Sequence, residues 1–153
     1  MILISGCLNG HNPSYDGVVK VNENMRDLVK NNRAIPVCPE LLGGLSVPRE
    51  RNEIKGSSGE DVIAGKCRVM SESGKDITKA FLRGAEIVLS IAKKHNIKKA
   101  VLKSKSPACG CGQIYDGTFT GRLIKGDGVT CALLKMNGIE VIDEITFENT
   151  SPV

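Results

Sequence analysis

The chain contains a stretch, Ala100-Val-Leu-Lys-Ser-Lys-Ser-Pro-Ala-Cys-Gly-Cys-Gly-Gln-Ile-Tyr-Asp-Gly-Thr-Phe119, in which a short apolar run passes directly into a loop rich in glycine and cysteine. The apolar run predicts a buried strand. Proline lacks a backbone donor and glycine opens positive φ, so regular structure should stop soon after the strand. A loop of this kind can hold backbone N–H groups and thiolates in one small volume. We interpret it as one wall of a reactive site.

The residues before this stretch carry the clearest helical pattern in the chain. The apolar residues that fall on one helical face are Phe81, Ala85, Val88, Leu89 and Ala92. They predict a helix from about Asp76, the expected cap, to His95. A helix that leads into a strand is the repeating unit of a parallel sheet.

Strands and helices alternate along the rest of the chain. The predicted strands are residues 2–4, 34–38, 67–70, 99–103 and 139–142. Helices are predicted after Asn22 and over 129–136, the latter capped by Asp127. Residues 49–65 are polar with several glycines, and we expect them to be a mobile excursion from the core. This alternation predicts an α/β fold with a mostly parallel sheet covered on both faces.

Composition limits the class of protein. The chain has 153 residues, 41% of them apolar, and a net charge of +4. We expect a single domain over residues 1–147, followed by a frayed tail at 148–153. Aromatic residues make up 3%, which disfavours an RNA-binding module that stacks bases on exposed rings. No apolar run approaches the roughly 20 residues of a membrane span, and no signal peptide is evident, so we expect a cytoplasmic protein.

Six cysteines are many for a reducing compartment, where structural disulfides are rare. Cys7, Cys38 and Cys109 each follow a predicted strand, and equivalent strand ends of a parallel sheet lie on one edge. Three thiolates at that edge suit a zinc site lacking one ligand, an iron–sulfur cluster with one open iron, or three inert buried thiols. Cys111 is a fourth ligand, a sulfur-handling thiol or a bystander. The remaining two, Cys67 and Cys131, are interpreted as core residues.

Candidate acid–base groups accompany these cysteines. Glu40 follows Cys38 by two residues, where a carboxylate can act as a general base on water. Ser104 and Ser106 precede the third cysteine and can orient water or substrate. Asp116, in a Tyr-Asp-Gly triplet, is typical of a turn.

Together these motifs resemble the thiouracil desulfidase family. The resemblance rests on Ser5-Gly-Cys-Leu8, Tyr15-Asp-Gly17, Cys38-Pro-Glu-Leu-Leu-Gly-Gly-Leu-Ser-Val-Pro-Arg49, Lys103-Ser-Lys-Ser-Pro-Ala-Cys-Gly110 and Ile114-Tyr-Asp-Gly-Thr-Phe119. It implies a Rossmann-like three-layer sandwich with an oxygen-sensitive 4Fe–4S cluster held by three cysteines. On this chain those ligands are Cys7, Cys38 and Cys109. The implied reaction is non-redox removal of sulfur from a thiolated pyrimidine, such as 2- or 4-thiouracil, to give the carbonyl form and hydrosulfide.

The resemblance also implies roles for other residues. The catalytic glutamate and serine of the family correspond to Glu40 and Ser106, with Glu53 and Ser104 as second choices. The residues expected to bind substrate are Ser104, Gly43, Gly44, Tyr15 and Asp16.

The chain departs from the family pattern at three positions. Ala108 stands where members commonly have serine, Ser14 where they usually have arginine, and Cys111 where they have a small residue without a thiol. These changes bear on the substrate more than on the cluster.

Two alternative functions stay open from the sequence. One is a binding module in which zinc is held by four cysteines, with Cys111 as the fourth. The other is a desulfidase of thiolated tRNA, which a net charge of +4 permits, although the chain carries no evident RNA-binding appendage.

Overall fold

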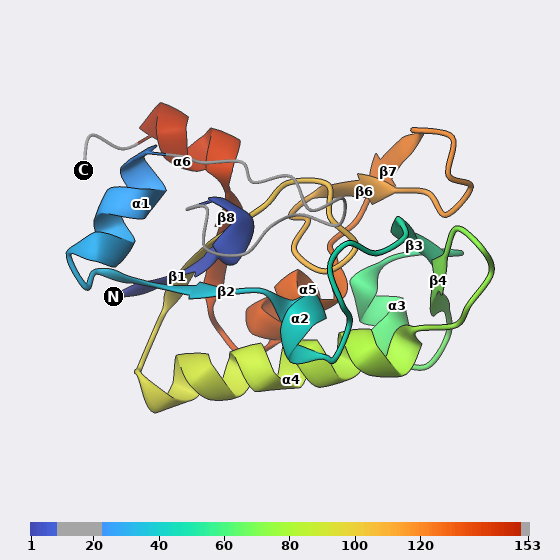
Figure 1. Cartoon of the computed structure of the whole chain (residues 1–153), viewed down its shortest axis with the longest axis horizontal. Helices are drawn as coiled ribbons and strands as arrows, with labels where there is room; N and C mark the ends of the chain where they lie inside the picture. Colours follow the sequence, from blue (N-terminus) through green and yellow to red (C-terminus); the bar gives the residue numbers. More distant parts are fainter. Residues whose placement is uncertain (9–22, 151–153) are drawn as a thin grey trace.

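The computed structural model of the chain describes residues 1–8 and 23–150, which contain a four-stranded parallel sheet (Figure 1). The sheet has the strand order β2-β1-β5-β8. Its strands are β1 (Ile2–Ser5), β2 (Ala34–Val37), β5 (Lys99–Leu102) and β8 (Glu140–Asp143). All three pairings are parallel, so the carboxyl ends of the strands share one edge. The predicted strands at these positions are confirmed.

Helices cover both faces of this sheet (Figure 1). One face carries α1 (Glu23–Lys30) and α6 (Glu144–Thr150). The other carries α2 (Pro39–Leu42), α4 (Thr78–Lys94) and α5 (Val129–Met136). The helices at α1, α4 and α5 match the predicted segments.

The alternation of side chains along the strands gives each face its own core. Ile4 and Val101 pack in one cluster with Met25 of α1 and Phe147 of α6. Neighbouring strand residues point the other way and pack with α4 and α5; the main members are Leu3, Ala100, Leu102, Phe81, Val88 and Leu134. Because successive residues of a strand face opposite sides, a continuous apolar run supplies both cores. The predicted three-layer α/β fold is therefore confirmed.

Two glycines allow α2 to lie directly against α4. A Cβ atom at Gly84 would lie 1.9 Å from the Pro39 carbonyl oxygen, and one at Gly43 would lie 2.0 Å from the Ala80 carbonyl oxygen. Contacts this short are impossible for a real side chain. The approach fixes α2, and with it Cys38 and Glu40, relative to the long helix.

The expected excursion at residues 49–65 is wrong, because this segment is largely regular. It contains β3 (Asn52–Lys55) and α3 (Gly59–Ile63), and β3 pairs antiparallel with β4 (Arg68–Ser71). Ile54 and Val62 are 1% exposed. Two buried apolar side chains in a polar segment are enough to hold this short unit against the core, and they give only a weak periodic signal.

The loop after β5 also contains a hairpin that the sequence did not indicate. β6 (Gln113–Tyr115) pairs antiparallel with β7 (Leu123–Lys125). At the other end of the chain, α6 continues through 148–150, where a frayed tail was expected. No helix in the described ranges is both long and apolar enough to cross a membrane.

Candidate active site

The three predicted ligand cysteines lie at the carboxyl edge of the sheet. Cys7 lies in the short 3-10 helix η1 (Gly6–Leu8), which directly follows β1. Cys38 directly follows β2 and precedes α2, and Cys109 lies in the loop after β5. The chain passes from β1 to β2 on one side of β1, and later to β5 on the other side. Such a switch point at the carboxyl ends is where open α/β sheets bind their ligands.

The three thiols are near enough to influence one another's charge. Burial raises the pKa of Cys7 to about 11, and the neighbouring Cys38 contributes to this increase. Burial also raises the pKa of Cys109 well above its usual value, and Cys7 and Cys38 both add to this increase. Without a positive partner these thiols stay protonated, whereas a bound metal would hold them as thiolates.

The distances between the Sγ atoms of Cys7, Cys38 and Cys109 indicate which metal group the three thiols can bind. Among the described residues, the only group of possible ligands within 4.8 Å of one another is Cys111, Asp127 and Cys131. At least one pair among Cys7, Cys38 and Cys109 therefore has its sulfurs more than 4.8 Å apart. In one tetrahedral zinc site the sulfurs lie about 3.8 Å apart, given a 2.3 Å Zn–S bond. In a 4Fe–4S cluster each thiolate binds a different iron. The three thiols fit a cluster better than a single ion.

The loop that carries Cys109 is held by the first turn of α5. The first N–H groups of a helix have no partner inside it. Here the amides of Val129 and Thr130 donate to the carbonyls of Pro107 (2.8 Å) and Ala108 (2.9 Å). These bonds hold the backbone of an irregular loop in place, and with it the segment that carries Cys109.

Two serines complete the support of Cys109. Ser106 Oγ accepts hydrogen bonds from the amides of Ala108 and Cys109, each at 3.1 Å. Ser5, at the end of β1, accepts a 2.8 Å bond from the Lys103 amide, and it also hydrogen-bonds to the Cys109 thiol. Ser106 therefore has a structural role in addition to the catalytic role predicted for it, which stays a prediction.

Glu40 lies among the three cysteines. Its charge raises the pKa of each of them, as expected for a carboxylate close to all three. Arg49 Nε donates a 3.1 Å hydrogen bond to Glu40 Oε2, and Arg49 Nη2 lies 2.9 Å from the same oxygen. The side chains are 8% (Arg49) and 14% (Glu40) exposed. The sequence placed Glu40 here but gave no role to Arg49.

Glu144, which the sequence analysis missed, organises the other side of the site. It is 9% exposed, at the first position of α6. Its carboxylate accepts bonds from the Ser104 amide (2.8 Å) and hydroxyl (2.6 Å), and from Lys103 Nζ (3.2 Å). The only available signal was its acidic side chain two residues after the last predicted strand.

The other residues predicted to bind substrate fall in different surroundings. Gly43 is packed against α4, while Gly44 is exposed, with φ near 100°. Tyr15 and Asp16 lie outside the described residues. Glu53, the second choice for the catalytic carboxylate, accepts bonds from the amides of Gly117 (2.9 Å) and Phe119 (3.1 Å), so it fixes the turn between β6 and β7.

The other cysteines do not join the group of three. Cys111 donates to the Val141 carbonyl (3.3 Å) and is hydrogen-bonded to Cys131, which lowers its pKa. Cys131 is fully buried in α5, as predicted. Cys67 is half-buried, packs against the edge of the main core and donates to the Ser58 carbonyl (3.7 Å), so its interpretation as a core residue is confirmed only in part. In this structure Cys111 therefore does not join Cys7, Cys38 and Cys109 in a four-cysteine zinc site.

Asp127 was predicted to cap α5, and this is also wrong. Gly128 occupies that position, and Asp127 Oδ1 instead accepts a 2.8 Å bond from the Gly112 amide. Lys135 donates to both oxygens of the same carboxylate (3.1 and 3.3 Å). The aspartate therefore joins the cysteine loop to α5 through side-chain contacts.

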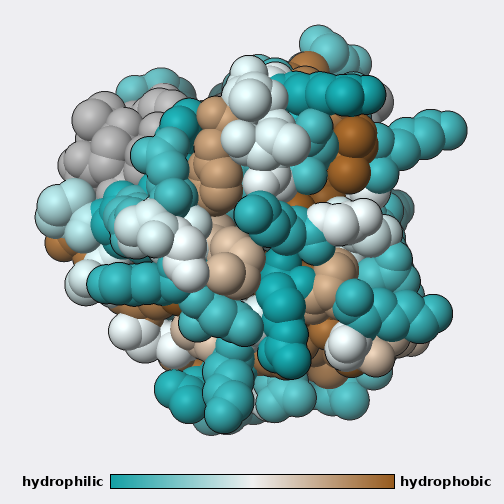
Figure 2. Space-filling model, turned by 90° about the vertical axis from the view of Figure 1, so that its right-hand side faces the viewer, coloured by the Kyte–Doolittle hydropathy of each residue, from teal (hydrophilic) through white to brown (hydrophobic). Residues whose placement is uncertain are grey.

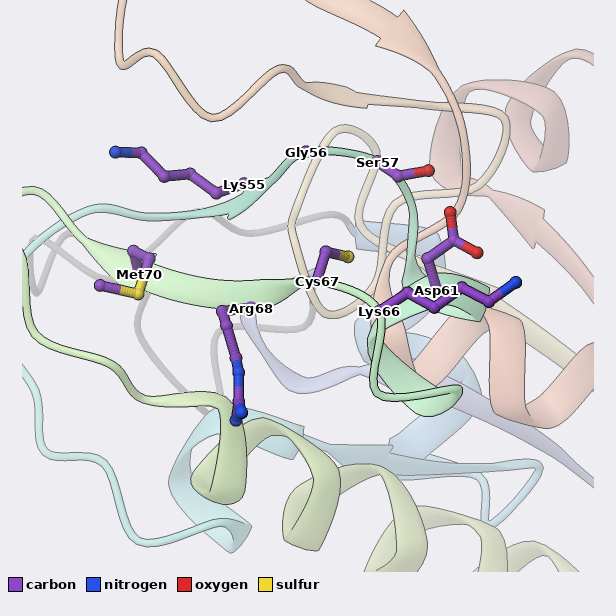
Figure 3. Close-up of a pocket in the computed structure, with 8 residues that line it drawn as sticks. All are labelled: Lys55, Gly56, Ser57, Asp61, Lys66, Cys67, Arg68 and Met70. Carbon is purple, nitrogen blue, oxygen red and sulfur yellow. The ribbon is translucent and has the colours of Figure 1, made fainter.

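A cavity of about 490 Å³ lies elsewhere, beside β3, α3 and β4 (Figure 3). Its cationic side chains, Lys55, Lys66 and Arg68, point in different directions rather than toward one ligand (Figure 3). Figure 2 shows the neighbouring side of the molecule, where hydrophilic residues predominate and apolar ones are scattered between them. None of the three edge cysteines lines this cavity.

The fold and the thiol group define an α/β protein with three thiols, suited to hold a metal cluster, at the carboxyl edge of its sheet. The 2-thiouracil desulfurase family matches residues 2–146. The chain belongs to this family, and the resemblance inferred from its motifs is confirmed.

Two similar proteins support this assignment. YbbK of Bacillus subtilis (strain 168), an uncharacterized protein, is 48% identical over 144 residues, which is 94% of this chain and 95% of that protein. A solved structure of TudS, a [4Fe-4S]-dependent thiouracil desulfidase, matches with a TM-score of 0.85 and 39% identity. The match covers 97% of this chain and 93% of that one.

Proposed function

We propose that this chain is a 4Fe–4S-dependent desulfidase that converts thiouracil, or a closely related thiolated pyrimidine, into its carbonyl form. The observation that carries the proposal is the grouping of Cys7, Cys38 and Cys109 around Glu40 at the switch point of the sheet. Membership of the desulfurase family and the likeness to TudS support it.

The three cysteines would hold the cluster through one thiolate each. When bound with three protein ligands, such a cluster supplies one iron without a protein ligand, a Lewis acid for the sulfur of the substrate. The net reaction exchanges this sulfur for the oxygen of water: the C=S group and one water molecule give C=O and hydrogen sulfide. No electron is gained or lost, so no external reductant is required.

Glu40 is proposed as the base that takes a proton from the attacking water. Both contacts with Arg49 fall on Oε2, and within the described ranges Oε1 has no hydrogen-bond partner. Arg49 therefore fixes the carboxylate while leaving one oxygen for the water. A base held within hydrogen-bond reach of its proton typically contributes a factor of about 100 to 10,000 in rate.

Ser106 and Ser104 are proposed to contact the substrate. Ser106 Oγ uses its lone pairs for two amides, so its hydroxyl hydrogen can be donated to a ring nitrogen or oxygen. Ser104 is held by Glu144 at the edge of the same loop. The backbone at Gly44 has open space around it and is proposed to contact the substrate. At Gly43 the close packing against α4 leaves no room for a side chain, so the glycine there needs no role in substrate binding.

We also propose that the protein works in the cytoplasm. Its six cysteines are unpaired, as expected in a reducing compartment, and an oxygen-sensitive cluster would be protected there.

The test is anaerobic reconstitution with iron and sulfide, followed by incubation with 2-thiouracil and 4-thiouracil. The loaded protein should bind about four irons per chain. It should release hydrosulfide and the carbonyl base in equal amounts. Loaded protein that leaves both bases unchanged would overturn the substrate assignment, and stoichiometric zinc with no iron would overturn the cofactor assignment. Cys67→Ser, which changes a half-buried cysteine outside the group of three, is the matched control.

A further inference from the structure

A second pair of thiols lies between the cluster loop and α5, separate from the three edge cysteines. The Sγ atoms of Cys111 and Cys131 lie within 4.8 Å of each other. Cys111 comes from the loop, where it is half-buried, and Cys131 is fully buried in the first turn of α5. The proposed desulfidase chemistry gives neither of them a role.

The surroundings of this pair favour redox chemistry over metal binding. Asp127 is the only other possible ligand within 4.8 Å in the described chain. Its two oxygens already accept bonds from Lys135, and the Lys135 ammonium also lies beside Cys111. A cation placed there repels an incoming metal ion, whereas two thiols this close to each other can be joined by thiol–disulfide exchange.

We propose that Cys111 and Cys131 are a redox-active dithiol that closes into a reversible disulfide when it reacts with a low-molecular-weight disulfide. The Cys111 thiolate attacks one sulfur of glutathione disulfide and releases one glutathione thiolate. The Cys131 thiolate then attacks the Cys111 sulfur of the mixed disulfide and releases the second. Two protein thiols lose two protons and two electrons, and the glutathione disulfide gains them as two glutathione molecules.

Closure of this bond would join two segments that already contact each other. Four backbone hydrogen bonds connect the first residues of α5 with the loop, including those from Gly128 to Gly110 and from Cys131 to Ala108. These bonds keep the two segments side by side, so the sulfurs start within 4.8 Å of each other and must approach to a bond of about 2.05 Å. The disulfide would tie the loop that carries Cys109 covalently to α5.

The experiment treats cluster-loaded protein with glutathione disulfide under anaerobic conditions, blocks free thiols, and digests the protein with trypsin. The tryptic peptides that contain these cysteines are residues 106–122 and 126–135. We expect them to be linked after treatment, with a loss of two hydrogens, and to separate on reduction. The same treatment of cluster-free protein should give the same link, because the dithiol is separate from the cluster ligands. The result is therefore independent of desulfidase activity.

Two variants identify the cysteines that form the link. Since peptide 106–122 also contains Cys109, Cys111→Ser is the decisive change, and it should reduce the linked product by about tenfold or more. Cys67→Ser should leave it unchanged. Absence of the link in the unmodified chain, or its persistence in Cys111→Ser, would overturn the proposal. So would binding of one zinc that is lost in Cys111→Ser, because it would make the pair a metal site.

Discussion

Arg49 contacts Glu40 through a single carboxylate oxygen, at 2.9 Å from Nη2 and 3.1 Å from Nε, in a pair that is almost fully buried. An arginine fork often binds both oxygens of a carboxylate. Here it leaves Oε1 without a partner in the described chain, beside three thiols. The pair thus combines a fixed orientation with a free oxygen, which is the requirement for a base that acts on water.

Replacing Glu40 with glutamine tests this assignment. The side chain keeps its size but can no longer accept a proton, so kcat should fall by about 100-fold to 10,000-fold. The iron content should stay unchanged, because no ligand is removed. Turnover of thiouracil by the reconstituted variant is the measurement.

Arg49→Lys is the companion variant. Lysine keeps the charge but loses the planar fork that orients Glu40. We expect a loss of about tenfold in kcat, smaller than that of Glu40→Gln, since the base itself remains. Full activity in both variants would show that Glu40 is not the base.

The three edge cysteines should each be essential for the cluster. Cys7→Ala, Cys38→Ala and Cys109→Ala each remove one thiolate, and the iron bound after anaerobic reconstitution should fall close to zero. Cys111→Ala should keep its iron, because the Cys111 thiol donates a hydrogen bond to the Val141 carbonyl and lies beside Cys131 instead. Loss of iron from Cys111→Ala alone would make it the third ligand in place of Cys109.

Glu144 should contribute to stability as well as to the site. Glu144→Gln replaces a carboxylate that accepts three hydrogen bonds, two from Ser104 and one from Lys103, with a group that has one acceptor oxygen. Because a half-buried donor then lacks its partner, the free energy of unfolding should fall by about 1–2 kcal/mol. Urea unfolding is the measurement. Glu86→Gln, an exposed site on α4, should change it by less than about 0.5 kcal/mol.

Gly84→Ala should disrupt the contact between α2 and α4. The new methyl group would meet the Pro39 carbonyl oxygen at 1.9 Å, so the helices must separate. Overpacking of this kind costs about 1–3 kcal/mol or more, and it should also displace Glu40 and reduce turnover. Ser90→Ala, on the exposed side of the same helix, should leave both properties nearly unchanged. Equal stability of the two variants would contradict the close approach.

Parts of the fold with a strong local pattern could be predicted from the sequence. α4 follows from five apolar residues at helical spacing, and the four strands of the parallel sheet follow from short apolar runs. The strand predicted at 67–70 corresponds to β4, but β3 and α3 were missed, because their position depends on few buried residues, such as Ile54 and Val62, within a polar segment.

The sequence by itself determined the family, the α/β fold and the placement of three cysteines at strand ends. These features depend on periodicity and on motifs that are continuous in the chain. Only the tertiary structure decided that Arg49 orients Glu40, that Glu144 binds Ser104, and that Cys111 belongs with Cys131. Each of these pairs joins residues separated by 9 to 40 positions. Their contacts depend on how helices and loops pack at the sheet edge, and local sequence carries no signal for that.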